Sequence, residues 1–327
     1  MKVIRNVYTS FVNIRLGIFI MASMLVIFSG LKAQTVKTVI IDAGHGLPDP
    51  GNQNAYSRES DIALAIAQKL YRKMQDSLPQ IKTLMTRTNQ NLPGGNTNKD
   101  IANRWRAEFA NQNKGDLFIC IHANDAPRVH HSEVVGHRKE VYYTGKKKKR
   151  RKHVSIVPIY RHWTTPSPAI GPETYIWASS ENSSKLEFVK NNSKPDSTQS
   201  ADESVDSTES KNAFSTEELI MATLRTKKYF ERSLLLADLV QEEFVRQGRP
   251  GDRGVRQRNE KRIWVLQATA MPSILVETGF MSSPTEGQYL VSEEGQEQIA
   301  SAIFNAIVQY INQLKAGKLF QSTGGMH

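Results

Sequence analysis

Four side chains that could bind a metal or move a proton lie beside apolar runs of this chain. His45 stands between two glycines just after the run "TVIIDA", His122 ends "DLFICIH", and Glu277 ends "SILVE". Ligands of open parallel sheets bind outside the carboxyl ends of the strands, so these three side chains could converge in one crevice. A fourth candidate is Glu59, which lies in "SRESD" before an apolar helical pattern.

These residue types fit the chemistry of a catalytic metal site. Two histidines and one carboxylate form the three-ligand set of catalytic zinc, which keeps a fourth position for water. Zinc lowers the pKa of such a water toward ~7, so a nucleophile is available at neutral pH. A second carboxylate outside the metal site could take the proton of the water and pass it to a leaving group. Each residue alone is weak evidence, but Glu277 interrupts an apolar strand where an unpaired charge would be costly.

The elements that must position these residues are strands and helices that alternate along the chain. This alternation predicts an α/β fold, a single domain with a mostly parallel, twisted central sheet covered by helices on both faces. Ser60 is a plausible N-cap of the first helix. Six strands are expected: one from Thr38, and others at 81–87, 116–124, 173–178, "RIWVL" and 273–277. Helices are expected at 60–74, 98–113, around 227–248 and at 296–314.

The chain begins with the features of an export signal. Basic residues precede an apolar run from Leu16 to Leu31, and Ala33 lies in a small-residue pattern close to that of a signal-peptidase site. We therefore expect residues 1–33 to be a signal peptide and the protein to be periplasmic, with a possible outer-envelope association. The alternative is an uncleaved anchor, although the run is shorter than the roughly 20 residues that span a bilayer. The one cysteine, Cys120, can form no disulfide within the chain.

Two insertions interrupt the main domain, which we expect over 34–318 and before a flexible tail at 319–327. The first, 128–168, contains a segment with eleven Lys or Arg and two Glu, a net charge of +9 out of the +11 of the whole chain. We expect a solvated basic loop there, and its residues 146–152 could be attracted to an anionic envelope surface. Nucleic acid is not expected as a partner, because no stacking platform of interleaved aromatic residues accompanies the basic run.

The second insertion, 182–226, differs from the first in composition. Its middle, "NNSKPDSTQSADESVDSTESKN", is acidic, rich in serine and nearly free of apolar residues. Such a segment cannot bury enough apolar surface to offset the entropy lost on ordering, so a disordered loop is expected. A possible regulatory helix follows it.

Four motifs in order resemble a known family. "VIIDAGHG", a Glu before "DIALAIAQKL", "RAEFAN" leading into "DLFICIHAN", and "MPSILVETGFMSS" are similar to motifs of the zinc-dependent N-acetylmuramoyl-L-alanine amidases that split septal peptidoglycan in cell division. The resemblance runs from about Val36 to Leu314. It implies one Zn²⁺ per chain and cleavage of the amide bond between N-acetylmuramic acid and the L-alanine of the stem peptide. An activator protein of the division machinery is a possible partner.

The resemblance also implies roles for single residues. The zinc ligands fall on His45, Glu59 and His122, and the catalytic glutamate falls on Glu277. Arg106 matches a characteristic arginine of the family, for which we expect a structural role. Leu47 and Cys120 stand where the family usually has Gly and Ser, and neither change removes a ligand.

Regulated members of this family carry a segment that covers the active site, with an acidic side chain in the open zinc position. Glu217 or Glu218 could serve in this way here. The alternative is a surface helix whose first-turn acids suit its dipole. Cys120 shares a strand face with His122, so a nucleophilic Cys–His pair is conceivable. Its apolar setting favours a packing role instead, because burial raises the pKa of a thiol.

Two other functions remain open at this point. A zinc carboxypeptidase acting on stem peptides uses a similar set of residues, but it would need an arginine for the terminal carboxylate, and the sequence singles none out. A catalytically inactive peptidoglycan-binding or divisome scaffold protein would tolerate the loss of a ligand. The presence of all four residues argues against the scaffold.

Overall fold

The computed structural model describes residues 36–54, 57–192, 215–259 and 262–317. Residues 36–309 form one compact unit, which is the part described below, and a second unit includes the chain from Tyr310 onward. The expected signal peptide, the tail at 319–327 and the middle of the second insertion lie outside the described residues. No helix within the described ranges is long and apolar enough to cross a membrane.

A six-stranded sheet forms the centre of the main unit. Its strand order is β2-β1-β3-β8-β6-β7, and four of the five neighbouring pairs are parallel; β6 and β8 alone are antiparallel. The mostly parallel sheet expected from the sequence is therefore confirmed. The strands are β1 (Thr38–Ala43), β2 (Lys82–Met85), β3 (Leu117–Asn124), β6 (Glu173–Ile176), β7 (Val255–Gln257) and β8 (Ser273–Phe280).

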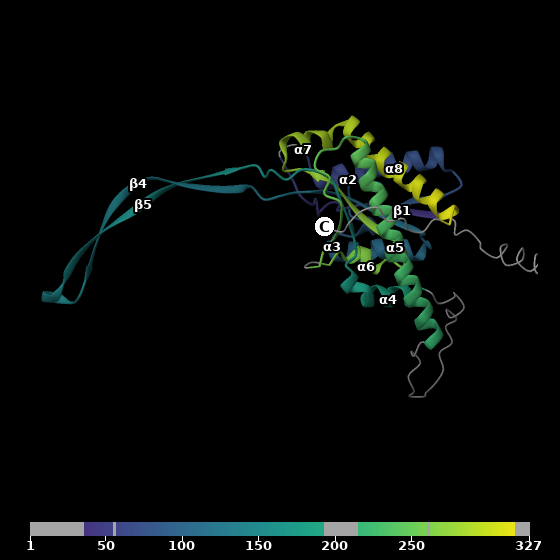
Figure 1. Cartoon of the computed structure of the whole chain (residues 1–327), viewed down its shortest axis with the longest axis horizontal. Coiled ribbons are helices and arrows are strands. Elements are labelled where there is room, and N and C mark those ends of the chain that lie inside the picture. The colour runs from purple at the N-terminus through teal and green to yellow at the C-terminus, as the bar shows by residue number, and fades with distance from the viewer. Residues whose placement is uncertain (1–35, 55–56, 193–214, 260–261, 318–327) are drawn as a thin grey trace, which may run out of the picture. The chain divides into compact units, whose positions relative to one another are not determined.

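Helices flank this sheet. Alternate residues of a strand point to opposite faces, and Ile40, Phe118 and Leu275 share one face that joins a buried cluster with Leu266 and Met271. Helix α6 contributes to that cluster, while α2 lies along β1, β2 and β3. Figure 1 shows α2 on one side of the sheet and α3 and α6 on the other. The helices are α2 (Glu59–Ser77), α3 (Lys99–Gln112), α4 (Asn182–Asn191), α5 (Thr216–Arg246), α6 (Trp264–Ala268), α7 (Pro284–Val291) and α8 (Glu293–Lys315).

Two local predictions are wrong. Helix α2 begins at Glu59 with Arg58 in the N-cap position, and Ser60 is a buried residue of the first turn rather than the cap. The segment "RIWVL" belongs to helix α6 and its approach, not to a strand. Its apolar side chains, Val265 and Leu266, enter the core cluster, and the place at the sheet edge is taken by β7, which pairs with β6.

The first insertion is a β-hairpin rather than a loop. Strands β4 (Val129–Thr144) and β5 (Arg151–Thr165) pair antiparallel along their whole length and form a second, two-stranded sheet. In Figure 1 they form a long twisted ribbon. The loop prediction failed because it was based on the charges of this segment. The segment also contains many β-branched and aromatic residues, and these favour strands.

Candidate metal centre

His45 lies in a turn just after β1. Its φ of 57° is in the left-handed region, which few residues other than glycine adopt, and such strain is typical of functional sites. A hydrogen bond holds the ring in this orientation, because Nδ1 of His45 is 2.9 Å from Oδ2 of Asp49. The other nitrogen, Nε2, is 3.2 Å from Oε1 of Glu59. The turn therefore directs the second ring nitrogen toward the carboxylate of Glu59, which begins α2.

Glu59 is the centre of the cluster and is 2% exposed. Its Oε2 accepts hydrogen bonds of 2.9 Å from both the backbone N–H and the side-chain Nδ2 of Asn52. Its Oε1 lies 2.7 Å from Nδ1 of His122. Burial alone would raise the pKa of Glu59, but the hydrogen bonds from His122 and His45 outweigh burial and lower this pKa far below its usual value. Glu59 is therefore ionised.

His122 comes from β3, the strand next to β1. The rings of His45 and His122 stand at 78° with centroids 4.8 Å apart. Burial lowers the pKa of His122, which favours the neutral ring that a metal requires. A Cβ on Gly44 would lie 2.4 Å from Nε2 of His122, so this position must be glycine for the ring to fit.

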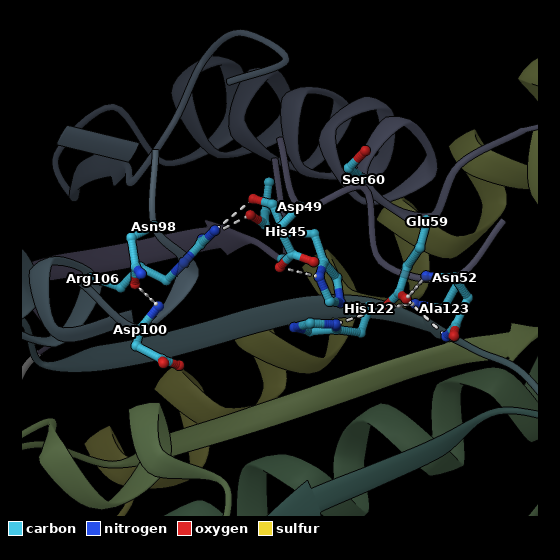
Figure 2. A network of polar contacts seen from close by, with 12 residues as sticks. His45, Asp49, Asn52, Glu59, Ser60, Asn98, Asp100, Arg106, His122 and Ala123 are labelled. Atoms are coloured by element: carbon cyan, nitrogen blue, oxygen red, sulfur yellow. Dashed lines mark hydrogen bonds and ion pairs between the residues drawn. The ribbon is translucent and has the colours of Figure 1, made fainter. Parts of the chain in front are cut away.

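The three residues fit a divalent metal ion. Ligand atoms of His45, Glu59 and His122 all lie within 4.8 Å of one another. Figure 2 shows the two rings and the carboxylate gathered at one place, with Asp49 next to His45 and Asn52 next to Glu59. Two imidazoles and one ionised carboxylate are a donor set suited to a transition metal such as zinc, and hydrogen bonds with Asp49 and Asn52 orient two of the three, His45 and Glu59. The expected ligands are thus brought together.

Glu277 lies beside this cluster on β8. It is the register partner of His122 on β3, so the two side chains leave neighbouring positions on one face of the sheet. It is 8% exposed, and its Oε2 is buried with no hydrogen-bond partner among the described residues. Burial and the negative charge of Glu59 raise the pKa of Glu277 to about 8. A carboxyl group in this state can hold or release a proton near neutral pH.

The sequence analysis missed Glu173, a second buried carboxylate on the other side of Glu277. Glu173 on β6 is the register partner of Glu277 and is 3% exposed. Its Oε1 accepts hydrogen bonds of 2.7 Å from Tyr175 and Asn124, and its Oε2 accepts one of 2.7 Å from Arg253. Glu173 is therefore fully bonded where Glu277 is not, which fits a structural role. A charge at the start of the apolar run "ETYI" was the available signal.

A positive charge near Glu277 was also missed. Arg258 lies over the ring of Tyr175, with its guanidinium carbon 4.8 Å from the ring centroid. Its charge acts on Glu277 and opposes the rise in the pKa of that residue. No pattern in "RQRN" distinguishes this arginine from its neighbours, so the sequence alone could not select it.

Arg106 and Cys120 have the expected structural roles. Arg106 is 2% exposed; it forms an ion pair with Asp42 and donates hydrogen bonds to the carbonyls of Ala43 at 2.8 Å and His45 at 2.5 Å. It thereby ties the turn of His45 to α3. The thiol of Cys120 donates a hydrogen bond of 2.9 Å to Asp42, and burial raises its pKa well above the usual value. A thiol in this state is a poor nucleophile.

The structure does not bring Glu217 or Glu218 to the cluster. Ser233 of α5 accepts from the backbone of Ser273 at the start of β8, and Arg249, just after α5, donates to the carbonyl of Thr278 near the end of β8. Helix α5 therefore runs in the direction of β8.

The first turn of α5 lies about 15 residues, or roughly 22 Å of helix, before Ser233 and away from Glu277. Glu217 and Glu218 are exposed there, and Glu218 forms a capping box with Ser215. A gating role would require this part of the helix to move.

Comparisons with known proteins agree with the motifs. The family model Amidase_3, described as N-acetylmuramoyl-L-alanine amidase, matches residues 39–309. An uncharacterized cell wall amidase of Bacillus anthracis is 25% identical over 274 residues, which are 84% of this chain and 35% of that protein. The amidase AmiC of Neisseria meningitidis is 37% identical over 91 residues, which are 28% of this chain and 20% of that protein. The chain thus spans about a third or less of the length of these relatives.

A solved structure supports the fold. The N-acetylmuramoyl-L-alanine amidase of Clostridium difficile 630 aligns with a TM-score of 0.51 at 22% identity, covering 85% of this chain and 98% of that one. Because the family model covers most of the sequence, the chain belongs to the N-acetylmuramoyl-L-alanine amidase family Amidase_3.

Proposed function

We propose that this protein is a zinc-dependent peptidoglycan hydrolase that cleaves the amide bond between N-acetylmuramic acid and the L-alanine of the stem peptide. One observation carries the proposal. The ligand atoms of His45, Glu59 and His122 lie within 4.8 Å of one another, and an unbonded buried carboxyl group, that of Glu277, is in register with His122 on the next strand. Family membership supplies the substrate class.

His45, Glu59 and His122 would hold the metal ion, with Asp49 and Asn52 keeping two of these ligands in place. When bound, zinc supplies Lewis acidity toward a carbonyl oxygen and makes a water molecule more acidic. Glu277 in its ionised form accepts the proton of the water that attacks the lactyl carbonyl carbon.

The same carboxyl group then returns the proton to the departing L-alanine nitrogen, as general acid–base catalysis requires. The carboxyl group of Glu277 is buried and its Oε2 has no hydrogen-bond partner among the described residues, so it is free to hold the proton between these two steps. One residue therefore serves as base and then as acid.

Mass spectrometry of the soluble products from purified sacculi tests this function. An amidase releases stem peptides with a free L-alanine amino group and leaves the glycan strands intact. A chelator should abolish release, and added zinc should restore it. Release of single terminal amino acids, or no products from the zinc-loaded protein, would contradict the proposal.

One observation favours a second candidate function, that of a zinc carboxypeptidase acting on stem peptides. A carboxypeptidase needs a cation for the terminal carboxylate of its substrate, and Arg258 places a positive charge near Glu277. The same product analysis distinguishes the two enzymes, because a carboxypeptidase shortens stem peptides without detaching them from the glycan. An inactive scaffold protein would give neither product.

We further propose the setting in which the enzyme acts. Its role would be cell-wall turnover and daughter-cell separation in the periplasm, after export by residues 1–33. An activator of the division machinery is a possible partner, and the basic residues 146–152 could contact an anionic envelope surface. Fractionation of cells that produce the full chain tests the location, and recovery of the protein in the cytoplasm would contradict it.

A further inference from the structure

The β4–β5 hairpin is an element that catalysis does not explain. Its strands contain 16 and 15 residues, so each is about 50 Å long. Within the described part of the chain the two strands pair only with each other, and nearly all of β4 is exposed. An isolated two-stranded ribbon is marginally stable in water unless something covers one face. In Figure 1 the ribbon stands clear of the labelled helices.

The register divides the hairpin into two different faces. Paired residues of an antiparallel ladder share a face, and successive residues alternate. Both glutamates of the hairpin, Glu133 and Glu140, lie on one face, which we name the paired face. Each forms an ion pair there, with Arg161 and Arg138 respectively. The negative charges of the hairpin are thus neutralised on the paired face.

Most of the exposed aliphatic residues lie on the opposite face, which we name the apolar face, although Ile159 and Val129 lie on the paired face. On β5, Val154, Ile156 and Tyr160 point to this side, with exposed fractions of 55%, 67% and 52%. On β4, the irregularity between Val134 and Gly136 shifts the alternation by one residue. Val134 and Val141 therefore share the apolar face, although seven residues separate them. Without that bulge they would point to opposite sides.

Aromatic rings of the hairpin are covered on both faces. On the paired face, Trp163 stacks on His131 with centroids 5.2 Å apart, and on the apolar face Tyr160 stacks on His162 at 6.0 Å. The aliphatic side chains of the apolar face have no such cover, since Ile156 is two-thirds exposed. The aliphatic surface of the apolar face is therefore the part of the ribbon that most lacks a partner among the described residues.

Charge indicates what that partner is. From Val141 to Val154 the chain holds seven Lys or Arg and no acidic residue, so the apolar face ends at a strongly cationic tip. A second copy of this hairpin would bring like charges together, which disfavours self-association. An anionic bilayer offers both features at once, because headgroup phosphates attract the cations and the acyl boundary accepts the aliphatic side chains.

We propose that the apolar face of the β4–β5 hairpin lies on an anionic phospholipid bilayer, with the tip cations among the lipid phosphates. The hairpin then holds the domain at a membrane surface without crossing it. This inference builds on the proposed contact between the basic tip and an anionic envelope surface, and it names that surface. It does not depend on hydrolysis, so it can be measured with an inactive variant.

Vesicle binding with a matched pair of variants tests the proposal. Ile156→Glu places a carboxylate on the apolar face opposite Lys139, and Val157→Glu places one on the paired face opposite Arg138. Both lower the net charge equally, and both face a cation across the ladder. We expect full-length protein to sediment with vesicles of phosphatidylethanolamine that contain about one-third phosphatidylglycerol. Ile156→Glu should weaken this binding at least about tenfold and Val157→Glu less than about threefold.

A local probe separates the hairpin from the N-terminal apolar run. Because Cys120 is buried, a polarity-sensitive fluorophore on Ile156→Cys or Val157→Cys labels the hairpin alone. Anionic vesicles should shift the emission of the first label to the blue and leave the second little changed, and phosphatidylcholine vesicles should shift neither. Equal shifts, equal weakening by the two glutamates, or no response to anionic vesicles would overturn the proposal. The last outcome would favour an acidic protein groove.

Discussion

At the scale of single residues, Glu59 holds the most demanding position, because one of its oxygens faces two imidazole rings. We expect Glu59→Gln to weaken metal binding at least about 100-fold, since it removes the only charged ligand of the set. Asn52→Ala, which removes one hydrogen bond behind the ligand, should cost about tenfold. Competition titration with a chromogenic chelator measures both. Wild-type affinity in Glu59→Gln would contradict the assignment of this ligand.

Glu277 links the stability of the metal-free protein to pH. Its pKa is about 8 in the folded protein, against an ordinary value of 4.5 for a glutamate, so between these pH values the folded state binds the extra proton. Stability therefore falls as pH rises from about 4.5 to 8. We expect Glu277→Gln to remove this slope and to raise the free energy of unfolding at pH 8 by on the order of 4 kcal/mol.

Urea unfolding of metal-free wild type and Glu277→Gln at pH 5 and pH 8 measures this effect. The difference between the two proteins should be small at pH 5 and larger at pH 8. A difference that shrinks as pH rises would mean that the pKa of Glu277 is not raised. Chelator must be present throughout, because a bound cation would favour the ionised carboxylate.

The residues that the sequence could predict are those with a fixed place relative to a strand or helix. His45 follows β1, His122 lies near the end of β3, and Glu59 begins a helix, whereas Glu277 lies within β8, which continues to Phe280 and not only to the expected end at residue 277. Asp49 and Asn52, which orient two of the ligands, lie in an irregular loop, where spacing says nothing about contact. Glu173 and Arg258 come near Glu277 only through the neighbouring placement of β6, β7 and β8, which no single segment reveals.

At the scale of elements, the turn after β1 depends on a glycine. A Cβ at Gly44 would lie 2.4 to 2.7 Å from three atoms of the His122 ring, so we expect Gly44→Ala to displace the ring and to lower both metal affinity and hydrolysis at least about 100-fold. Gly136→Ala is the control, because its Cβ would meet only Ile159 at 3.9 Å. Metal content and product release should follow wild type in the control. An active, metal-loaded Gly44→Ala protein would show that the ring tolerates the shift.

Helix α5 directs its first turn away from the metal centre. We therefore expect Glu217→Gln and Glu218→Gln, singly or together, to leave the rate of sacculus hydrolysis within about twofold of wild type, as exposed substitutions away from a site usually do. A rise of tenfold or more would instead support the gating role, and it would mean that the helix adopts a second position. Circular dichroism controls for the loss of the capping box at Ser215.

Most elements of the sheet and its helices follow from local patterns, because a buried strand and an amphipathic helix each have a distinct period. The β4–β5 hairpin and α6 could not be predicted from local patterns. In β4 and β5, charged residues alternate irregularly with valine and tyrosine, and a bulge breaks the period of two. In α6, five residues are too few to show a helical period. Their structure depends on pairing and packing with distant segments.

At the scale of the whole molecule, the parallel strands bring the chemistry to one edge of the sheet. β1, β3 and β8 are neighbours, so the turn after β1, His122 near the end of β3 and Glu277 in the second half of β8 come together near the start of α2. Sequence positions that are more than 200 residues apart, such as His45 and Glu277, thereby serve one site. In the proposed function, this arrangement would separate two tasks, metal binding by three residues and proton transfer by a fourth.

The hydrolysis rate of the zinc-loaded Glu277→Gln protein tests this separation most directly. Metal content, measured on the same sample, should equal that of wild type, because Glu277 is not among the three grouped ligands. Release of stem peptides from sacculi should fall about 100- to 10,000-fold, the usual contribution of a general acid–base residue. Substantial release by a variant that keeps its zinc would contradict the account.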